Sequence, residues 1–122
     1  MTILQVSNVS GGYTRKPVIK DLSFTIEKGE LVGLIGLNGA GKSTTIKHII
    51  GTLIQREGEI RLNGVTLKEN MDAYRSSFSY IPETPVLYDE LTLKEHLALT
   101  AMAYGIDEKT LAERSEKLLK EF

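Results

Sequence analysis

The first part of the chain alternates apolar and polar residues with a period of two, the pattern that predicts β-strands. Leu4 and Val6 are separated by polar residues and predict a half-buried strand that ends near Asn8, before a glycine turn. The same alternation across residues 22–26 predicts a second strand, which ends at the Lys28-Gly29 turn. We therefore expect two strands of the antiparallel type at the start of the fold.

The pattern changes at Leu31 to Ile35, an unbroken apolar run that predicts a parallel strand buried on both faces. After a glycine-rich stretch, apolar residues recur at the i, i+3, i+4 and i+7 positions of one helical stripe. These residues are Ile46, Ile49, Ile50 and Leu53. A parallel strand after two antiparallel-type strands predicts a mixed sheet, so the chain indicates an α/β fold.

The middle of the chain contains a hairpin signal, since Asn63-Gly64 separates alternating residues 60–62 from residues 65–67. Residues 70–76 predict a short helix. Residues 78–81 predict a short strand that ends before a proline, because proline cannot continue a central strand.

The last part of the chain is rich in helix signals. Thr92 and Glu95 have the spacing of a capping box, and Gly105 is placed to end the helix that follows. Asp107 is placed to cap a last helix, whose many charges we interpret as its solvated face. No repeat or linker marks a domain boundary, although the pattern changes from strand-rich to helix-rich around Pro82.

The composition limits the function classes. At 122 residues the chain has the size of one domain, and its net charge of −1 provides no field that would gather nucleic acid or anionic lipid. It has no cysteine, which excludes disulfides and thiolate metal sites and suits a reducing cytosol. There is no leader pattern and no run of about 18 apolar residues. We therefore expect no nucleic-acid partner and no direct membrane insertion.

The candidate chemistry lies in residues 36–44, GLNGAGKST, here called the phosphate loop. They match the pattern G-x-x-x-x-G-K-[ST], with Gly36 and Gly41 as its fixed glycines. Glycines let backbone N–H groups surround a phosphate, Lys42 adds a positive charge, and Ser43 offers a hydroxyl to Mg²⁺. The other interpretation is a glycine-rich turn with a surface lysine, which the flanking strand and helix patterns disfavour. The loop predicts a nucleoside triphosphate ligand.

From Leu4 to about Leu99 the chain resembles the first part of the ATP-binding subunit of an ABC transporter. The resemblance is carried by GGYTRKPVIKDLSFTIEKGELVGLIGLNGAGKST, then GEIRLNG and SYIPETPVLYDELTLKEHL. It implies an ABC-type nucleotide-binding domain fragment with the P-loop NTPase fold and a mixed sheet. Residues 1–82 would form the β-rich subdomain with part of the phosphate-loop core. Residues 83–122 would form the following switch segment and the start of the helical subdomain.

The resemblance also assigns site residues. Tyr13 matches the aromatic residue that stacks on adenine in this family, whereas a lone tyrosine would otherwise be a half-buried turn residue. The expected ATP contacts share the phosphate loop and the first helical turn: Gly36, Asn38, Gly39, Ala40, Gly41, Lys42, Ser43, Thr44 and Thr45. Without the resemblance, Thr44 and Thr45 would be ordinary first-turn residues.

Glu83 departs from the family pattern, which has glutamine at the corresponding position. That glutamine contacts Mg²⁺ and the attacking water and relays the nucleotide state to the membrane partner. A carboxylate is also a hard oxygen ligand, but its charge opposes the γ-phosphate unless the metal lies between them. Glu83 is therefore either a tuned switch or an exposed acid. On the switch interpretation Lys42 and Glu83 are catalytic, and Ser43 and Glu83 hold Mg²⁺.

His48 and His96 each stand alone on a predicted helix, so we expect surface or satisfied packing roles rather than metal binding. The stretch from Pro82 to Pro85 is similar to exporter ATPases of the Ecs group.

Several family elements are absent from these 122 residues. They are the Leu-Ser-Gly-Gly-Gln signature, the strand ending in Asp-Glu and the switch histidine. We therefore expect the N-terminal portion of a subunit, which binds ATP and Mg²⁺ but has little or no hydrolysis alone. The complete subunit would be an ATPase in the cytoplasm, peripheral at the inner face of the cell membrane. Its partners would be a transmembrane permease subunit and a second ATP-binding subunit.

Three alternatives remain at this point. One is a P-loop phosphotransferase, and another is an ABC-type protein that acts in translation or DNA repair without a permease. The third is an interaction module.

The apolar segments 31–35 and 78–81 also predict exposed sheet edges and self-association.

Overall fold

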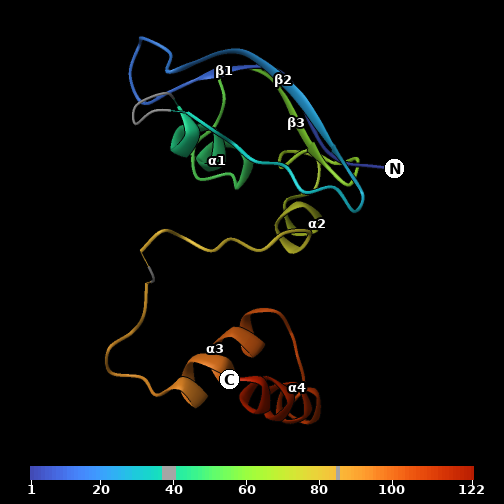
Figure 1. Cartoon of the computed structure of the whole chain (residues 1–122), viewed down its shortest axis with the longest axis vertical. Helices are drawn as coiled ribbons and strands as arrows, with labels where there is room; N and C mark the ends of the chain where they lie inside the picture. Colours follow the sequence, from blue (N-terminus) through green and yellow to red (C-terminus); the bar gives the residue numbers. More distant parts are fainter. Residues whose placement is uncertain (37–40, 85) are drawn as a thin grey trace. The chain divides into compact units, whose positions relative to one another are not determined.

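In the computed structural model, residues 1–36, 41–84 and 86–122 are described, and the chain forms two compact units (Figure 1). The first unit is Met1–Tyr80 and the second is Ile81–Phe122. Among the described residues, no helix combines the length and the apolar character needed to cross a membrane.

Within its described residues, the first unit is built on a three-stranded antiparallel sheet in the order β2-β1-β3 (Figure 1). The strands are β1 (Thr2–Gly11), β2 (Ile19–Glu27) and β3 (Glu57–Leu62). The predicted strands at the start of the chain and across residues 22–26 are thus confirmed. The first strand in the sequence is the central strand of the sheet, so β1 positions the other two.

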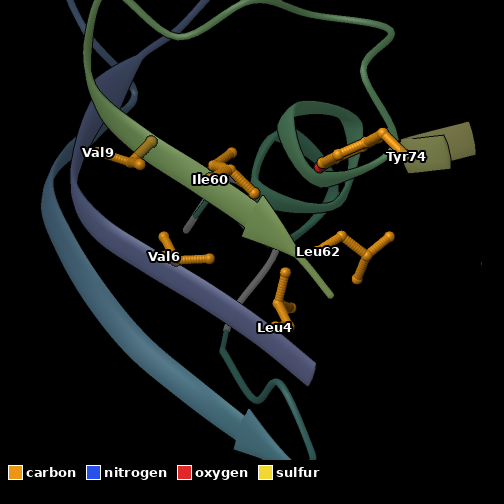
Figure 2. Close-up of a cluster of buried hydrophobic side chains, with 6 residues drawn as sticks. All are labelled: Leu4, Val6, Val9, Ile60, Leu62 and Tyr74. Carbon is orange, nitrogen blue, oxygen red and sulfur yellow. The ribbon is translucent and has the colours of Figure 1, made fainter. Parts of the chain in front are cut away.

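The core of the first unit lies on one face of this sheet (Figure 2). Its buried side chains come from β1, β3 and α2 (Met71–Ser76): Leu4, Val6, Val9, Ile60, Leu62 and Tyr74. The Tyr74 hydroxyl donates a hydrogen bond to the carbonyl of Ile49, the last residue of α1 (Lys42–Ile49). Burial of apolar side chains supplies the main favourable free energy of such a fold. The core therefore ties α1 and α2 to the sheet.

A β-bulge lies in the middle of β1. Asn8 has a φ of 49°, and the pairing of β1 with β2 shifts register between Val6 and Val9. The pairing with β3 also shifts, and Gly58 of β3 has a φ of +86° there. We predicted that the first strand ends near Asn8, but the bulge absorbs the irregular residue and the strand continues to Gly11.

Two predicted strands are not formed, and both predictions are wrong. The segment from Leu31 to Ile35 has no regular structure, and Leu31 and Ile35 are 101% and 95% exposed. Residues 78–81 are likewise outside any strand. A parallel strand needs a neighbouring strand for its hydrogen bonds and cover on both faces. The described residues place no strand beside either segment, so their sheet is antiparallel and lacks the predicted parallel strand.

The predicted hairpin turn is present, but its second arm is short. Asn63 and Gly64 both have positive φ, 50° and 83°, as a type I′ turn requires. Leu62 pairs with Val65 in an isolated bridge, and no strand follows in the described residues. The predicted short helix at residues 70–76 is confirmed as α2, which Asn70 caps by accepting a hydrogen bond from the Ala73 N–H.

The second unit contains α3 (Leu93–Ala103) and α4 (Glu108–Glu121). The predicted capping box of α3 is complete: Thr92 accepts from the Glu95 N–H at 3.1 Å, and Glu95 accepts from the Thr92 N–H at 3.0 Å. Asp107 caps α4 through the Thr110 N–H at 2.7 Å. Gly105, with a φ of +67°, allows the chain to turn between the two helices.

Candidate functional site

The candidate site begins at the N-terminus of α1. The residue before this helix is a glycine, which has no side chain to cap it. Gly41 has a φ of +92°, a region that favours glycine, and no side chain caps the helix among the described residues. The Gly41 carbonyl accepts hydrogen bonds from the Thr45 N–H and hydroxyl at 2.8 and 2.7 Å. The first N–H groups of an α-helix have no partner within it, and they carry the positive end of its dipole. This end of α1 therefore suits an anion.

Lys42 and Ser43 differ in how free their side chains are. The Lys42 ammonium donates a hydrogen bond to the carbonyl of Gly36, which draws the lysine across the two ends of the phosphate loop. The Ser43 side chain is exposed. A hydroxyl is a hard oxygen ligand, so Ser43 fits a share in a Mg²⁺ site whose other ligands are phosphate oxygens and water. Among the described residues, no cluster of three His, Cys, Asp or Glu residues could hold a metal.

The side of α1 that is buried differs from the predicted apolar stripe. The buried residues of α1 are Thr44, Thr45 and His48, whereas Ile46 is 36% exposed. The prediction assumed that apolar residues decide which face of the helix is buried. However, the Thr45 hydroxyl bonds to the Gly41 carbonyl and the His48 ring bonds to the Thr44 carbonyl. Such bonds allow polar side chains to be buried.

His48 is buried at 3% exposure, so of the two roles expected for it, surface or packing, the structure supports packing. Its Nδ1 lies 2.7 Å from the Thr44 carbonyl, which only accepts, so Nδ1 carries the proton. The buried Nε2 has no hydrogen-bond partner among the described residues. A Cβ built on Gly11 would lie 2.3 Å from Nε2, so the ring faces the end of β1. The expected packing role is confirmed, but only one of the two nitrogens is hydrogen bonded.

His96 fulfils the packing role that we predicted for it. Its Nδ1 lies 2.8 Å from the Thr92 carbonyl, and its Nε2 accepts from the Tyr88 N–H at 3.0 Å. Both nitrogens are therefore occupied by local bonds within the second unit.

Tyr13 lies in the turn after β1 and is 58% exposed. The Lys47 ammonium of α1 lies over its ring, 5.2 Å from the centroid, which is within cation–π range. Tyr13, first through hydrogen bonding and then through charge, raises the pKa of Lys47 above its ordinary value. Lys47 was missed in the sequence. No local pattern indicated this contact, because Lys47 and Tyr13 lie far apart in the sequence.

The structure says less about the other predicted site residues. Asn38, Gly39 and Ala40 lie outside the described residues. Glu83 belongs to the second unit and is exposed. The described part of the first unit includes the two ends of the phosphate loop, the first turn of α1 and the ring of Tyr13.

A family model described as "ABC transporter" matches residues 19–122. The ABC-type transporter ATP-binding protein EcsA of Bacillus subtilis is 62% identical over 122 residues, which cover 100% of this chain and 49% of that protein. The uncharacterized ABC transporter ATP-binding protein YthP of the same organism is 46% identical, over 98% of this chain and 47% of its own.

A solved structure titled "Structure of ATP binding subunit of ABC transporter" is also similar. It superposes with a TM-score of 0.90 at 57% identity and covers 98% of this chain. The match covers 50% of that structure's chain. The chain thus spans about half the length of the relatives that it matches.

Proposed function

The chain belongs to the ABC transporter ATP-binding family, and from this premise we propose that it carries the adenine and phosphate contacts of an ATP site that powers transport. The observation that supports the site most directly is the start of α1. There a glycine with positive φ precedes Lys42 and an exposed Ser43, without a capping side chain in the described residues. Helix N-termini of this kind bind phosphate.

In the proposed site each predicted residue has a distinct role. Lys42 binds the β- and γ-phosphates, and Ser43 offers its hydroxyl to Mg²⁺, which would offset phosphate charge when bound. Tyr13 stacks on adenine with its exposed ring. Thr44 and Thr45 contact the nucleotide from the first turn of α1, whose buried side they also occupy. Gly36, Asn38, Gly39, Ala40 and Gly41 supply the backbone around the phosphates.

Glu83 is proposed as the switch residue of the second unit, where it contacts Mg²⁺ in place of the usual glutamine. Its exposure leaves the carboxylate available to a ligand. Replacing Glu83 with Gln should change the Mg²⁺ dependence of ATP affinity. Unchanged affinity and unchanged hydrolysis in the complete subunit would count against this role.

At the scale of the whole protein, we propose that residues 1–82 supply the β-rich subdomain with part of the phosphate-loop core. Residues 83–122 supply the switch segment and the start of the helical subdomain. The complete subunit would hydrolyse ATP at the cytoplasmic face of the cell membrane, with a permease and a second ATP-binding subunit as partners. The 122-residue chain alone would show little or no hydrolysis. Family membership argues against the P-loop phosphotransferase alternative.

Isothermal titration of the chain with ATP, with and without Mg²⁺, tests this function. We expect saturable binding that Mg²⁺ strengthens. Lys42→Ala should weaken it about ten- to hundredfold, because a hydrogen bond to a charged group is lost. Lys28→Ala, in an exposed turn after β2, is the matched control and should leave binding unchanged. Absence of binding at millimolar ATP would overturn the proposal.

A further inference from the structure

The exposed ring of Tyr13 is held from one side by a charged residue of α1. Lys47 projects from the last turn of this helix, and its ammonium lies 5.2 Å from the centroid of the ring. Tyr13 itself lies in an irregular turn, where the backbone alone does not fix its side chain. The contact with Lys47 therefore links the ring to the helix that begins at the phosphate loop.

We propose that Lys47 is a positioning residue for nucleotide binding, which holds the Tyr13 ring so that a purine base can stack on the opposite face. This inference rests on the proposed function, in which Tyr13 stacks on adenine. It adds a residue to the site that acts through Tyr13 and does not touch the phosphates.

The position of Lys47 on α1 separates this role from phosphate binding. It follows Lys42 by five residues, and an α-helix rises about 1.5 Å per residue, so it lies about 7.5 Å further along the axis. Lysine is favourable there, because the last turn of a helix carries the negative end of the dipole. The phosphate-binding end is the opposite one. Lys47 is thus placed to serve the base and not the triphosphate.

The physical benefit of the contact is preorganisation. An exposed aromatic side chain loses rotamer freedom when a ligand stacks on it, and that loss weakens binding. A ring that is already held by a cation loses less. A lysine ammonium is charged throughout the neutral pH range, and Tyr13 raises the pKa of Lys47 further. Removing the cation should therefore weaken binding of base-containing ligands alone.

The test compares ATP with inorganic tripolyphosphate, which has phosphates but no base, in titrations of the whole chain. Lys47→Met keeps most of the aliphatic stem and the helix propensity but removes the charge. We expect ATP affinity to fall about three- to tenfold and tripolyphosphate affinity to stay unchanged. Lys47→Arg should restore most of the ATP affinity, because arginine also binds aromatic faces. Lys28→Met is the control for loss of one positive charge.

A double-mutant cycle with Tyr13→Ala completes the test, since Lys47→Met should have no effect once the ring is absent. Far-UV circular dichroism of each variant checks that the fold is kept. ATP binding that Lys47→Met leaves unchanged or strengthens would reject this inference and leave the proposed function in place. An equal loss for ATP and tripolyphosphate would identify Lys47 as a phosphate ligand and also reject it. A wild-type chain that binds neither ligand would reject both.

Discussion

At the scale of single residues, the close approach of His48 to β1 explains why glycine is needed at position 11. The ring of His48 occupies the space that a side chain would need. Its Nδ1 bond to the Thr44 carbonyl keeps the ring on the buried side of α1. The contact thereby fixes the distance between the phosphate-loop helix and the central strand.

Gly11→Ala should destabilise the first unit, since the added Cβ would lie 2.3 Å from Nε2 and 3.1 Å from Cε1 of His48. Overpacking of a tight core costs about 1–3 kcal/mol. Urea unfolding of the chain would measure this loss. Gly33→Ala is the control, because a Cβ there meets nothing within 4 Å and no positive φ is involved. Equal stability of the two variants would show that the ring moves aside freely.

The candidate-site residues that could be predicted are those carried by a local motif. Lys42, Ser43 and their glycines follow from the order of residues in the phosphate loop. The roles of Lys47 and His48 could not be predicted in this way. They depend on the rotation of α1 against β1 and on the path of the turn that carries Tyr13. Both are decided by packing between segments distant in the sequence.

At the scale of the elements, the bulge of β1 depends on Gly58, and a neighbouring glycine allows a matched test. Gly58 and Gly64 have nearly equal φ values, 86° and 83°. A Cβ on Gly58 would lie 2.3 Å from the Asn8 carbonyl oxygen and 2.4 Å from that of Ser7, whereas one on Gly64 would meet nothing within 4 Å. The two positions therefore differ in crowding and not in backbone strain.

Gly64→Ala should cost about 1 kcal/mol of unfolding free energy for placing alanine at positive φ. Gly58→Ala should cost more, by about 1–3 kcal/mol, because backbone oxygens of β1 must move. Denaturant unfolding of both variants would give the difference. Equal losses would show that the bulge adjusts without cost.

The helix caps of the second unit should make its helix content depend on acid. The backbone N–H groups of Thr92 and Thr110 lower the pKa of Glu95 and Asp107, respectively. A lowered pKa in the folded state stabilises the fold above the ordinary pKa and ceases to do so as the pH falls through the folded value. Helix signal at 222 nm should therefore decrease below pH 4.5 for the Glu95 contribution and below pH 3.8 for that of Asp107.

Glu95→Gln and Asp107→Ala identify the source of this acid effect. Each variant should have lower helix content at neutral pH and a smaller change on acidification. An acid transition identical to that of the wild-type chain would assign the effect to other carboxyl groups.

The elements that could be predicted are those with local signals. Asn70, Thr92 and Asp107 each cap a helix by bonding to an N–H three residues later, so a few neighbouring residues suffice to place the helix start. The segment from Leu31 to Ile35 is different. Its apolar run indicates a segment suited to burial, but a strand forms only where another segment supplies hydrogen bonds. That information is not local.

At the scale of the whole molecule, the exposed apolar segment around Leu31 and Ile35 should promote self-association. Both side chains are almost fully exposed, and the backbone between them is outside any strand. Unpaired backbone beside apolar side chains favours pairing with another chain. We expect the purified chain to sediment as species larger than a monomer, in proportions that rise with concentration.

Leu31→Lys combined with Ile35→Lys should shift the chain towards the monomer, because charge opposes edge pairing. Val86→Lys combined with Met102→Lys is the control at other exposed apolar residues. A wild-type chain that stays monomeric at all concentrations would contradict the expectation. An equal effect of the control pair would assign association to general apolar exposure.

The central place of β1 in the sheet affects the free energy of nucleotide binding. Pairing of Ser10 with Glu57 closes the chain between them into a large loop that contains both Tyr13 and the phosphate loop. Closing such a loop lowers chain entropy by an amount that grows slowly with its length. This entropy is lost during folding, when the sheet and its core form. A nucleotide that binds later therefore restricts only the local motion that remains in the loop. A substitution that loosens β3 would thus weaken nucleotide binding from a distance, without removing any group that contacts the ligand.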